Sequence, residues 1–213
     1  MDWTMSRNYY LTLLFVVALA CLAGCNGPSN EAANQAADGT DQSANAPKVK
    51  VETSSGEFII TLQPDKAPKT VAQFIENVNN GVYNNSIVHN VVQGYNIMIG
   101  GVKSSTDYPE AKEIPNEATP ENSNKQWTVA MLHDLDKVES DSVEFIINMK
   151  DNIELDAQQG GAESPDTCGY CVFGIVTDGF NTLETINTTP TMEKGEFEYA
   201  PVQDITVTKM SIL

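Results

Sequence analysis

Short apolar runs separated by polar turns cover the chain after residue 47. Residues 49–63 read as two alternating strands around a Ser-Ser-Gly turn, and residues 83–101 as two strands joined at Gln93-Gly94. A polar loop is expected from about 102 to 126. Further strands are expected at 127–132, 144–150, 170–176 and 204–212. This spacing of short strands predicts a mainly β domain.

Two segments have helical spacing instead. Between residues 65 and 81 a proline suits the first helical turn and Gly81 suits the end. The apolar residues there recur at i, i+3, i+4 and i+7, and they are Val71, Phe74, Ile75 and Val78. Residues 178–188 predict a second, shorter helix. The pattern favours an eight-stranded antiparallel barrel capped by two α-helices, although periodicity alone leaves a sandwich open.

The first 24 residues have the pattern of a secretory signal peptide. Arg7 precedes an apolar run over residues 11–20, which is shorter than the roughly 20 apolar residues that a membrane-spanning helix needs. The sequence LAGC at residues 22–25 resembles a bacterial lipobox, and this resemblance implies lipidation of Cys25. An ordinary cleaved signal and an uncleaved anchor are the alternatives.

Residues 25–47 predict a lipidated cysteine followed by a flexible tether. Residues 26–47 contain no aromatic residue, leucine, valine or isoleucine, so they cannot bury a core. A flexible chain of this length typically spans roughly 25 Å. We therefore expect a folded domain over 48–213, held by Cys25 near a membrane on the extracytoplasmic side of a bacterial cell envelope.

The charge of the chain limits its partners. The formal net charge is -17, which repels nucleic acid phosphates and anionic lipid surfaces. The only arginine is Arg7, inside the predicted signal peptide, so every later cation is a lysine. We expect no nucleic acid partner.

The order of the motifs indicates a family. APKTVAQFIENVNNGVY, VHNVV, EFIINMKDN, GYCVFGIV and DGFNTLETI follow one another in this chain. Their order resembles that of the cyclophilin-type peptidyl-prolyl isomerases, most closely the compact bacterial forms, from about Val49 to Leu213. The resemblance implies a barrel with an outer groove that binds proline-containing peptides or unfolded exported proteins, with no cofactor.

The segment VHNVV departs from the family at the position that matters most for catalysis. His89 matches a family histidine, but Asn90 stands where the family usually has an arginine. No other arginine follows Arg7, and Lys103 is the nearest cation in sequence that could replace it. Asn90 is therefore the candidate catalytic residue, with one neutral amide in place of a guanidinium.

The resemblance also implies the remaining groove residues. With His89, they are Tyr95, Asn96, Met98, Leu132, His133, Glu144, Ile146, Glu154, Leu155 and Tyr170. Tyr95 keeps an apolar floor, whereas Glu144 and Glu154 replace a glutamine and an aromatic residue. At a rim, these two carboxylates would favour a basic peptide; otherwise they are solvated surface groups.

Three functional hypotheses follow. The first is an isomerase of X-Pro bonds with weakened catalysis, and the second is a non-catalytic proline-peptide or protein-binding module on the same fold. The third is a thiol-redox lipoprotein, suggested by CGYC at 168–171 but disfavoured because the pair enters a strand. A disulfide between Cys168 and Cys171 stays open. With only two histidines, His89 and His133, we expect no metal site.

Overall fold

A computed structural model describes residues 46–213, except 105–108, 110–111, 135 and 162. The predicted signal peptide, Cys25 and nearly all of the predicted tether lie outside the described residues. Within the described residues, no helix is both long and apolar enough to cross a membrane.

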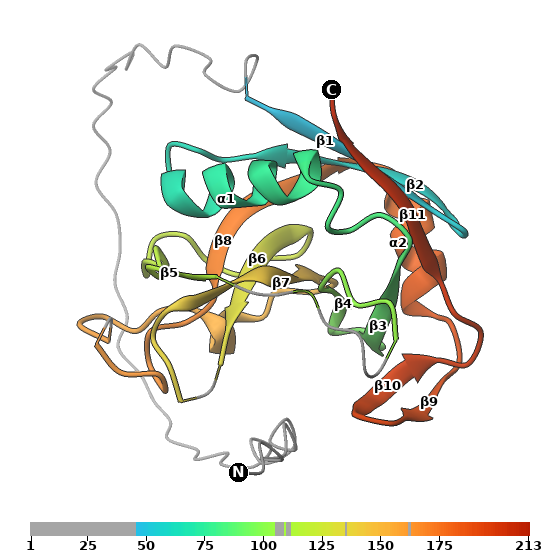
Figure 1. Cartoon of the computed structure of the whole chain (residues 1–213). Helices are drawn as coiled ribbons and strands as arrows, with labels where there is room; N and C mark the ends of the chain where they lie inside the picture. The colour runs from blue at the N-terminus through green and yellow to red at the C-terminus, as the bar shows by residue number, and fades with distance from the viewer. Residues whose placement is uncertain (1–45, 105–108, 110–111, 135, 162) are drawn as a thin grey trace, which may run out of the picture. The chain divides into compact units, whose positions relative to one another are not determined.

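The domain consists of short strands with two α-helices and one 3-10 helix, η2 (Figure 1). The helices are α1 (Pro68–Asn79), η2 (Ile153–Leu155) and α2 (Phe180–Asn187). The strands are β1 (Lys48–Thr53), β2 (Gly56–Leu62), β3 (Ser86–Val92), β4 (Asn96–Ile99), β5 (Glu113–Ile114), β6 (Thr128–His133), β7 (Ser140–Asn148), β8 (Cys171–Asp178), β9 (Thr191–Lys194), β10 (Phe197–Pro201) and β11 (Thr206–Ile212).

Eight of these strands form a closed antiparallel ring. They pair in the order β4-β3-β11-β1-β2-β8-β6-β7, and a further pairing between β4 and β7 closes the sheet. Closure removes the open edges that would otherwise pair with other chains. The predicted eight-stranded barrel is thus confirmed. Strand β5 pairs with one end of β7, outside the ring.

Each α-helix contacts strands from separate parts of the ring. Helix α1 contacts β7, β8 and β11, no two of which are paired, and α2 contacts β2 as well as the paired strands β3 and β4. Helix α1 begins with Pro68 in its first turn, as its sequence predicts, and Gly81 has a φ of 71° just after the helix ends. The buried face of α1 carries Val71, Phe74 and Val78.

A cluster of four aromatic side chains connects α1 with the inside of the barrel. The ring centre of Phe74 lies 5.5 Å from that of Tyr83, 5.5 Å from that of Phe145 and 4.9 Å from that of Phe173. The Tyr83 hydroxyl donates a hydrogen bond of 3.0 Å to the carbonyl of Val143, so its polar end is satisfied although the side chain is buried. These contacts fix the faces of β7 and β8 that point inward.

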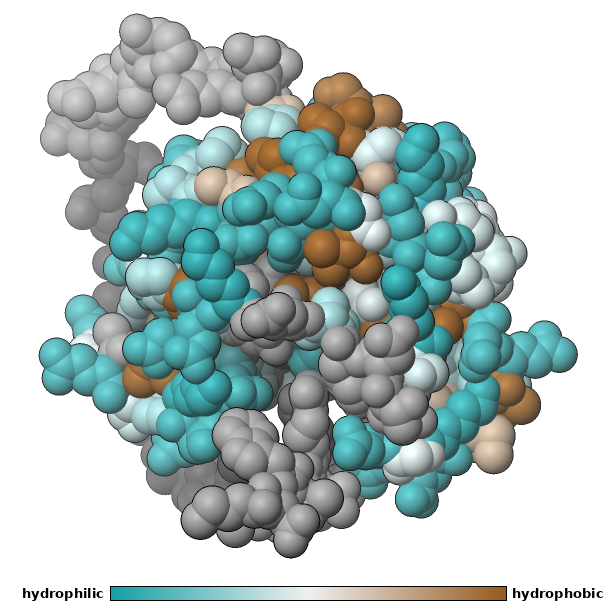
Figure 2. Space-filling view, viewed as in Figure 1, coloured by the Kyte–Doolittle hydropathy of each residue, from teal (hydrophilic) through white to brown (hydrophobic). Residues whose placement is uncertain are grey.

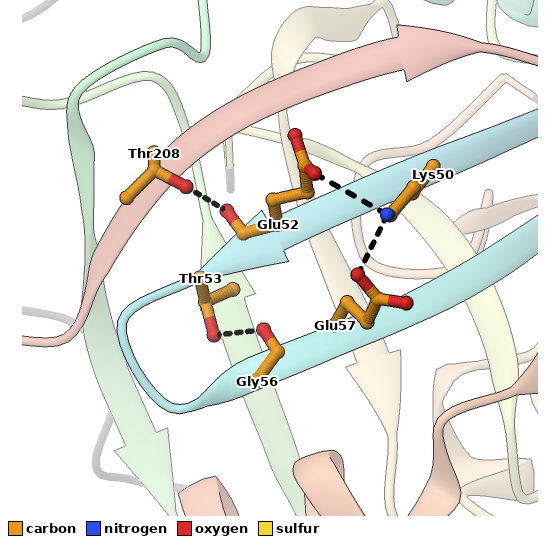
Figure 3. Close-up of polar contacts among 6 residues, drawn as sticks. All are labelled: Lys50, Glu52, Thr53, Gly56, Glu57 and Thr208. Carbon is orange, nitrogen blue, oxygen red and sulfur yellow. Dashed lines mark hydrogen bonds and ion pairs between the residues drawn. The ribbon is translucent and has the colours of Figure 1, made fainter.

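Polar contacts hold the β1–β2 hairpin from outside (Figure 3). The Lys50 ammonium lies 2.6 Å from a Glu57 oxygen and 3.3 Å from a Glu52 oxygen, and these carboxylates raise the pKa of Lys50. The Thr53 hydroxyl donates to the carbonyl of Gly56, and the Thr208 hydroxyl donates to that of Glu52. These groups are exposed or partly exposed, so they help to set the turn more than they add stability.

The structure departs from the sequence-based elements in three places. The two-residue strand β5 lies inside the predicted polar loop, and β7 begins four residues before the predicted residue 144. The hairpin of β9 and β10 was also not predicted. Strands β5, β9 and β10 have only two, four and five residues, so periodicity does not mark them.

The visible surface is mostly hydrophilic. Figure 2 shows hydrophobic side chains only in small separate areas of this face. Among the described residues, the exposed large hydrophobic side chains come from separate elements; they are Ile153, Phe180, Met192, Val202, Ile212 and Leu213. This distribution agrees with the strongly acidic composition.

Candidate functional site

One row of residues crosses five neighbouring strands of the barrel. Asn90 on β3 is paired with Met98 on β4, and Met98 with Ile146 on β7. Ile146 is paired with Ala130 on β6, and Ala130 with Val172 on β8. Directly paired residues project from the same face of a sheet. The residues next to these along each strand belong to the inner core, so the row faces outward. These neighbours include Val91, Ile97, Met131, Phe145 and Cys171.

Most of this row belongs to a second apolar group, separate from the inner core. Its strand members are Met98, Ala130, Leu132, Ile146 and Val172, and the partly buried Leu155 and Tyr170 pack against them. We call these seven residues the outer cluster. Its strand members expose at most 8% of their surface, so Leu155 and Tyr170 form its accessible edge. The structure therefore brings together five of the predicted groove residues.

A β-bulge at His89 turns Asn90 toward the outer face. Val88 is paired with Ile99 and Asn90 with Met98, so His89 is an extra residue on β3. Val88 and Val91 both enter the inner core although they are three residues apart, which regular alternation would not allow. If the strand alternated regularly from Val88 through His89, Asn90 would point into the barrel.

Asn90 is held by the β9–β10 hairpin. Its Oδ1 accepts a hydrogen bond of 2.9 Å from the backbone N–H of Tyr199. The ladder between β9 and β10 is irregular between Phe197 and Ala200, which directs the Tyr199 N–H away from β9. With Oδ1 occupied, the group that the half-buried Asn90 can offer to a ligand is its Nδ2 amide.

His89 and Glu144 form a buried contact beside Asn90. His89 is 3% exposed, and its Nε2 lies 3.4 Å from Oε1 of Glu144. The His89 ring centre lies 5.2 Å from that of Phe197, on the hairpin that also holds Asn90. His89 thus lies buried, in contact with a carboxylate.

The structure corrects the expected position of Glu144. The side chain was expected at an exposed rim, but the residue is only 7% exposed. A Cβ atom on Gly100 would lie 2.5 Å from the Glu144 Cγ, so the glycine leaves the space that Glu144 fills. Glu144 therefore cannot attract a basic peptide as a solvated surface carboxylate does.

Tyr95, Lys150 and Glu154 form a polar group next to the outer cluster. The Lys150 ammonium lies 4.9 Å from the centre of the Tyr95 ring and 3.7 Å from a Glu154 oxygen. Burial, followed by the charge and hydrogen bond of Glu154, raises the pKa of Tyr95 well above its usual value. Glu154 is exposed as expected, but Lys150 balances its charge. Lys103, the sequence-based candidate for a groove cation, is exposed, and Lys150 lies over Tyr95 instead.

His133 has both ring nitrogens engaged. Its Nδ1 lies 2.7 Å from the carbonyl oxygen of Asp134, which can only accept, so Nδ1 carries the proton. Its Nε2 faces the Cys168 thiol, 3.4 Å away, whose single proton can go to this nitrogen or to the carbonyl of Pro165, and its ring packs 5.0 Å from that of Tyr170. His133 therefore presents its ring edge, and no free nitrogen, beside the outer cluster.

Cys168 and Cys171 do not form a disulfide in this structure. Both thiols are free and buried; Cys171 belongs to the inner core and Cys168 lies beside His133 outside it. Burial raises the pKa of Cys168, and it raises that of Cys171 to about 11. A redox thiol needs a lowered pKa and access to solvent. The geometry thus argues against the thiol-redox hypothesis.

A network of asparagines fixes the edge of the outer cluster. Asn124 Nδ2 donates to the carbonyls of Leu155 and Tyr170, and Asn148 Nδ2 donates to Asn124 Oδ1. Asn152 donates to Asn148 Oδ1 at 2.8 Å and to the carbonyl of Tyr95 at 3.1 Å. These bonds hold η2 and the start of β8 against β6 and β7.

Sequence reasoning missed two members of the outer cluster, Ala130 and Val172. Each lies two residues from a predicted groove residue, Leu132 and Tyr170 respectively, so strand alternation could have found them. It also missed the bond from Tyr199, since no local pattern links two strands so far apart in the chain. Among the described residues, no group of three or more potential ligand side chains could hold a metal ion.

Comparison with known proteins fits this barrel and its motifs. Residues 48–212 match the family model described as cyclophilin type peptidyl-prolyl cis-trans isomerase/CLD. The chain belongs to the cyclophilin family. Peptidyl-prolyl cis-trans isomerase B of Escherichia coli is 33% identical to this cyclophilin over 165 residues, covering 77% of this chain and 98% of the relative. The cyp18 isomerase of Streptomyces antibioticus is 32% identical over 166 residues, covering 78% and 98%.

A solved structure agrees on the fold. A cyclophilin-type isomerase from Cryptosporidium parvum superposes on this cyclophilin with a TM-score of 0.66 at 21% identity, covering 79% of this chain and 98% of that chain. Family membership and the barrel expected from the sequence are therefore confirmed. The comparisons leave open the departures at Asn90, Asn96, Glu144 and Glu154.

Proposed function

We propose that this cyclophilin binds X-Pro segments of exported proteins over its outer cluster and catalyses their isomerisation weakly. The observation that carries this proposal is the outward row in which Asn90 continues directly from Met98 and Ile146. It sets an amide donor at the end of an apolar row of side chains. Leu155 and Tyr170 form the accessible edge of that surface.

The chemistry needs little more than such a surface. Rotation about a peptide bond faces a barrier of about 18–20 kcal/mol because the C–N bond has double-bond character. A donor aimed at the prolyl nitrogen favours the twisted bond, in which that nitrogen is pyramidal, over the planar bond. The Asn90 Nδ2 amide is the group that we assign to this role.

The neutral amide makes weak catalysis the expected outcome. The resemblance places an arginine at this position in the family, and residues 8–213 contain none. Loss of one preorganised donor typically lowers a rate by about 10²–10³-fold, by analogy with oxyanion holes. A non-catalytic binding module is the second candidate, favoured by the bond that occupies Asn90 Oδ1.

Two further observations support the proposed ligand and location. A second Cryptosporidium parvum cyclophilin structure, with a TM-score of 0.65, was determined in the presence of the dipeptide Ala-Pro. For this chain, we propose the same kind of ligand on the outer cluster. The lipobox-like segment 22–25 and the polar segment that follows support anchoring of the domain to an envelope membrane through Cys25.

A titration of isotope-labelled residues 45–213 with Ala-Pro tests the binding site by NMR. This segment forms one compact unit and corresponds to nearly the whole length of the Escherichia coli relative. We expect Ala-Pro to change the chemical shifts of Met98, Leu155 and Tyr170, and Ala-Ala to change them less. Leu155→Asp should abolish them, because it places a charge at the apolar edge of the cluster.

Ile153→Asp is the matched control, since Ile153 lies on the same short helix but is 68% exposed. It should leave the shifts unchanged. Equal responses to Ala-Pro and Ala-Ala, or equal losses in the two variants, would contradict the proposed site.

A further inference from the structure

Asn96 lies on the outer face next to the outer cluster. It begins β4, where it is paired with Val92 on β3 and with Asn148 on β7. Ile97 points into the inner core, so Asn96 shares the outward face with Met98, two residues along the strand. Asn96 therefore belongs to a row parallel to that of Asn90 and Met98, one step away.

The side-chain oxygen of Asn96 has no hydrogen-bond partner among the described residues. The residue is 3% exposed, and its Oδ1 is buried without a donor. Its paired neighbour cannot supply one easily, because Asn148 Nδ2 already donates to Asn124 and Thr128. Asn148 Oδ1 already accepts from Asn152.

An unpartnered buried amide in this place indicates a ligand contact. Buried polar side chains in folded proteins are almost always hydrogen-bonded, so an exception calls for an explanation. Asn152 Oδ1 is a second buried acceptor without a donor in the described part of the chain, and its Nδ2 is bonded to the carbonyl of Tyr95, the residue before Asn96. Two buried side-chain oxygens without a donor in the described part of the chain thus belong to residues next to Tyr95, Asn96 in sequence and Asn152 through its hydrogen bond.

We infer that Asn96 is a specificity-determining residue. It favours peptides in which the residue that lies over the outer cluster carries an uncharged hydrogen-bonding group, either a hydroxyl or a carboxamide. The inference rests on the proposed function, since it assumes that the peptide lies over the outer cluster. Met98 offers apolar contact to the body of that residue, and Asn96 offers a donor and an acceptor to its polar end. A charged end is disfavoured because burial of an unpaired charge is costly.

A pair of peptides that differ by one hydroxyl tests this inference. Binding of acetyl-Ala-Ala-Pro-Ala-amide and of its trans-4-hydroxyproline counterpart is measured by calorimetry on residues 45–213. We expect the hydroxyproline peptide to bind about five- to 150-fold more tightly, since it satisfies a group that is otherwise buried without a partner. A ratio near one in the unaltered protein would overturn the inference without any variant.

Asn96→Leu assigns the preference to this side chain. The ratio should fall to about one in Asn96→Leu, because the change removes the polar contact that distinguishes the two peptides. The matched control Asn79→Leu, on an exposed position of α1, should keep the full ratio. An unchanged ratio in Asn96→Leu would overturn the assignment, and Asn96→Ala serves as a second variant if the leucine prevents folding.

The outcomes separate this inference from the proposed function. Binding of the proline peptide with no preference for hydroxyproline would leave the proposed function intact and reject the role of Asn96. Binding of the hydroxyproline peptide alone, lost in Asn96→Leu, would support the role of Asn96 and reject proline as the ligand. Failure of both peptides to bind would reject both.

Discussion

The side-chain oxygen of Asn90 accepts a hydrogen bond of 2.9 Å from the backbone N–H of Tyr199. This bond joins β3 to the β9–β10 hairpin and leaves the Asn90 Nδ2 as the donor that can face a ligand. Two irregularities make it possible, the bulge at His89 and the irregular register of β10. The central question for this cyclophilin is whether one fixed neutral amide is enough for catalysis.

Asn90→Arg should raise isomerase activity. If the missing cation is the main deficit, kcat/KM should increase by up to about 10²–10³-fold. The variant also removes the acceptor for the Tyr199 N–H, so we expect a loss of roughly 0.5–1.5 kcal/mol in the free energy of unfolding. A protease-coupled assay and urea unfolding measure the two effects.

Asn90→Ala is the control for this experiment. It removes both the donor and the acceptor, so it should lose a similar amount of stability and also lose any residual activity. Equal activity in the alanine variant and the unaltered protein would show that Asn90 contributes no donor.

Glu144→Gln should increase the gain from Asn90→Arg. Glu144 contacts His89, the residue beside Asn90, so an arginine at position 90 has a buried carboxylate nearby with which to pair. Such pairing would turn the guanidinium away from the prolyl nitrogen. We therefore expect Asn90→Arg/Glu144→Gln to have a kcat/KM about tenfold higher than that of Asn90→Arg alone. This factor is smaller than the change of about 10²–10³-fold that full loss of one donor causes.

Glu144→Gln alone should leave activity close to that of the unaltered protein, because the amide at position 90 is still neutral. A double variant that is no faster than Asn90→Arg would show that Glu144 does not compete for the cation.

Strand alternation made much of the fold predictable, and the family resemblance named residues of the site. The resemblance implied Met98, Leu132 and Ile146 as groove residues, and the register of the barrel brings them together. Helix α1 was predictable too, since its apolar spacing and its proline both indicate a helix. The family resemblance supplied the barrel closure that periodicity left open.

The remaining features depend on contacts that local patterns do not encode. The bulge at His89 is visible only through the pairing of β3 with β4. Tyr199 lies 109 residues from Asn90, and the burial of Glu144 requires the space at Gly100. The expectation that Glu144 would be exposed was wrong, because it assumed that this carboxylate is solvated.

Cys168 and Cys171 should be unreactive in the folded domain. Both are buried and their pKa values are raised, so little thiolate exists near pH 8. We expect slow reaction of residues 45–213 with Ellman's reagent at pH 8 and rapid reaction of both thiols in denaturant. Rapid labelling of the folded protein, or a Cys168–Cys171 disulfide found by mass spectrometry, would contradict this.

The raised pKa of Cys171 predicts that the stability of the domain depends on pH. The pKa of Cys171 is raised from 9.0 to about 11, so the folded state retains its proton where the unfolded state loses it. This contribution to the free energy of unfolding is complete below about pH 8 and falls as the pH rises from about 9 toward 11. Cys171→Ala should remove this part of the pH dependence measured by urea unfolding.

Cys25 should carry the lipid that anchors the protein. In a bacterial host, the full chain should incorporate labelled palmitate and sediment with membranes, since acyl chains anchor by burying methylene groups. Cys25→Ser should lose both the label and the sedimentation, whereas Cys21→Ser, four residues earlier, should keep them. Label retained in Cys25→Ser would contradict the proposed anchor.

The most direct test of the account is the rate at which residues 45–213 isomerise an Ala-Pro peptide bond, measured with the protease-coupled assay against the uncatalysed rate. We predict a rate above background, lower than that of the Escherichia coli relative by about 10²–10³-fold, and abolished in Asn90→Ala. A rate indistinguishable from uncatalysed isomerisation would contradict the enzymatic function and leave a proline-peptide binding module.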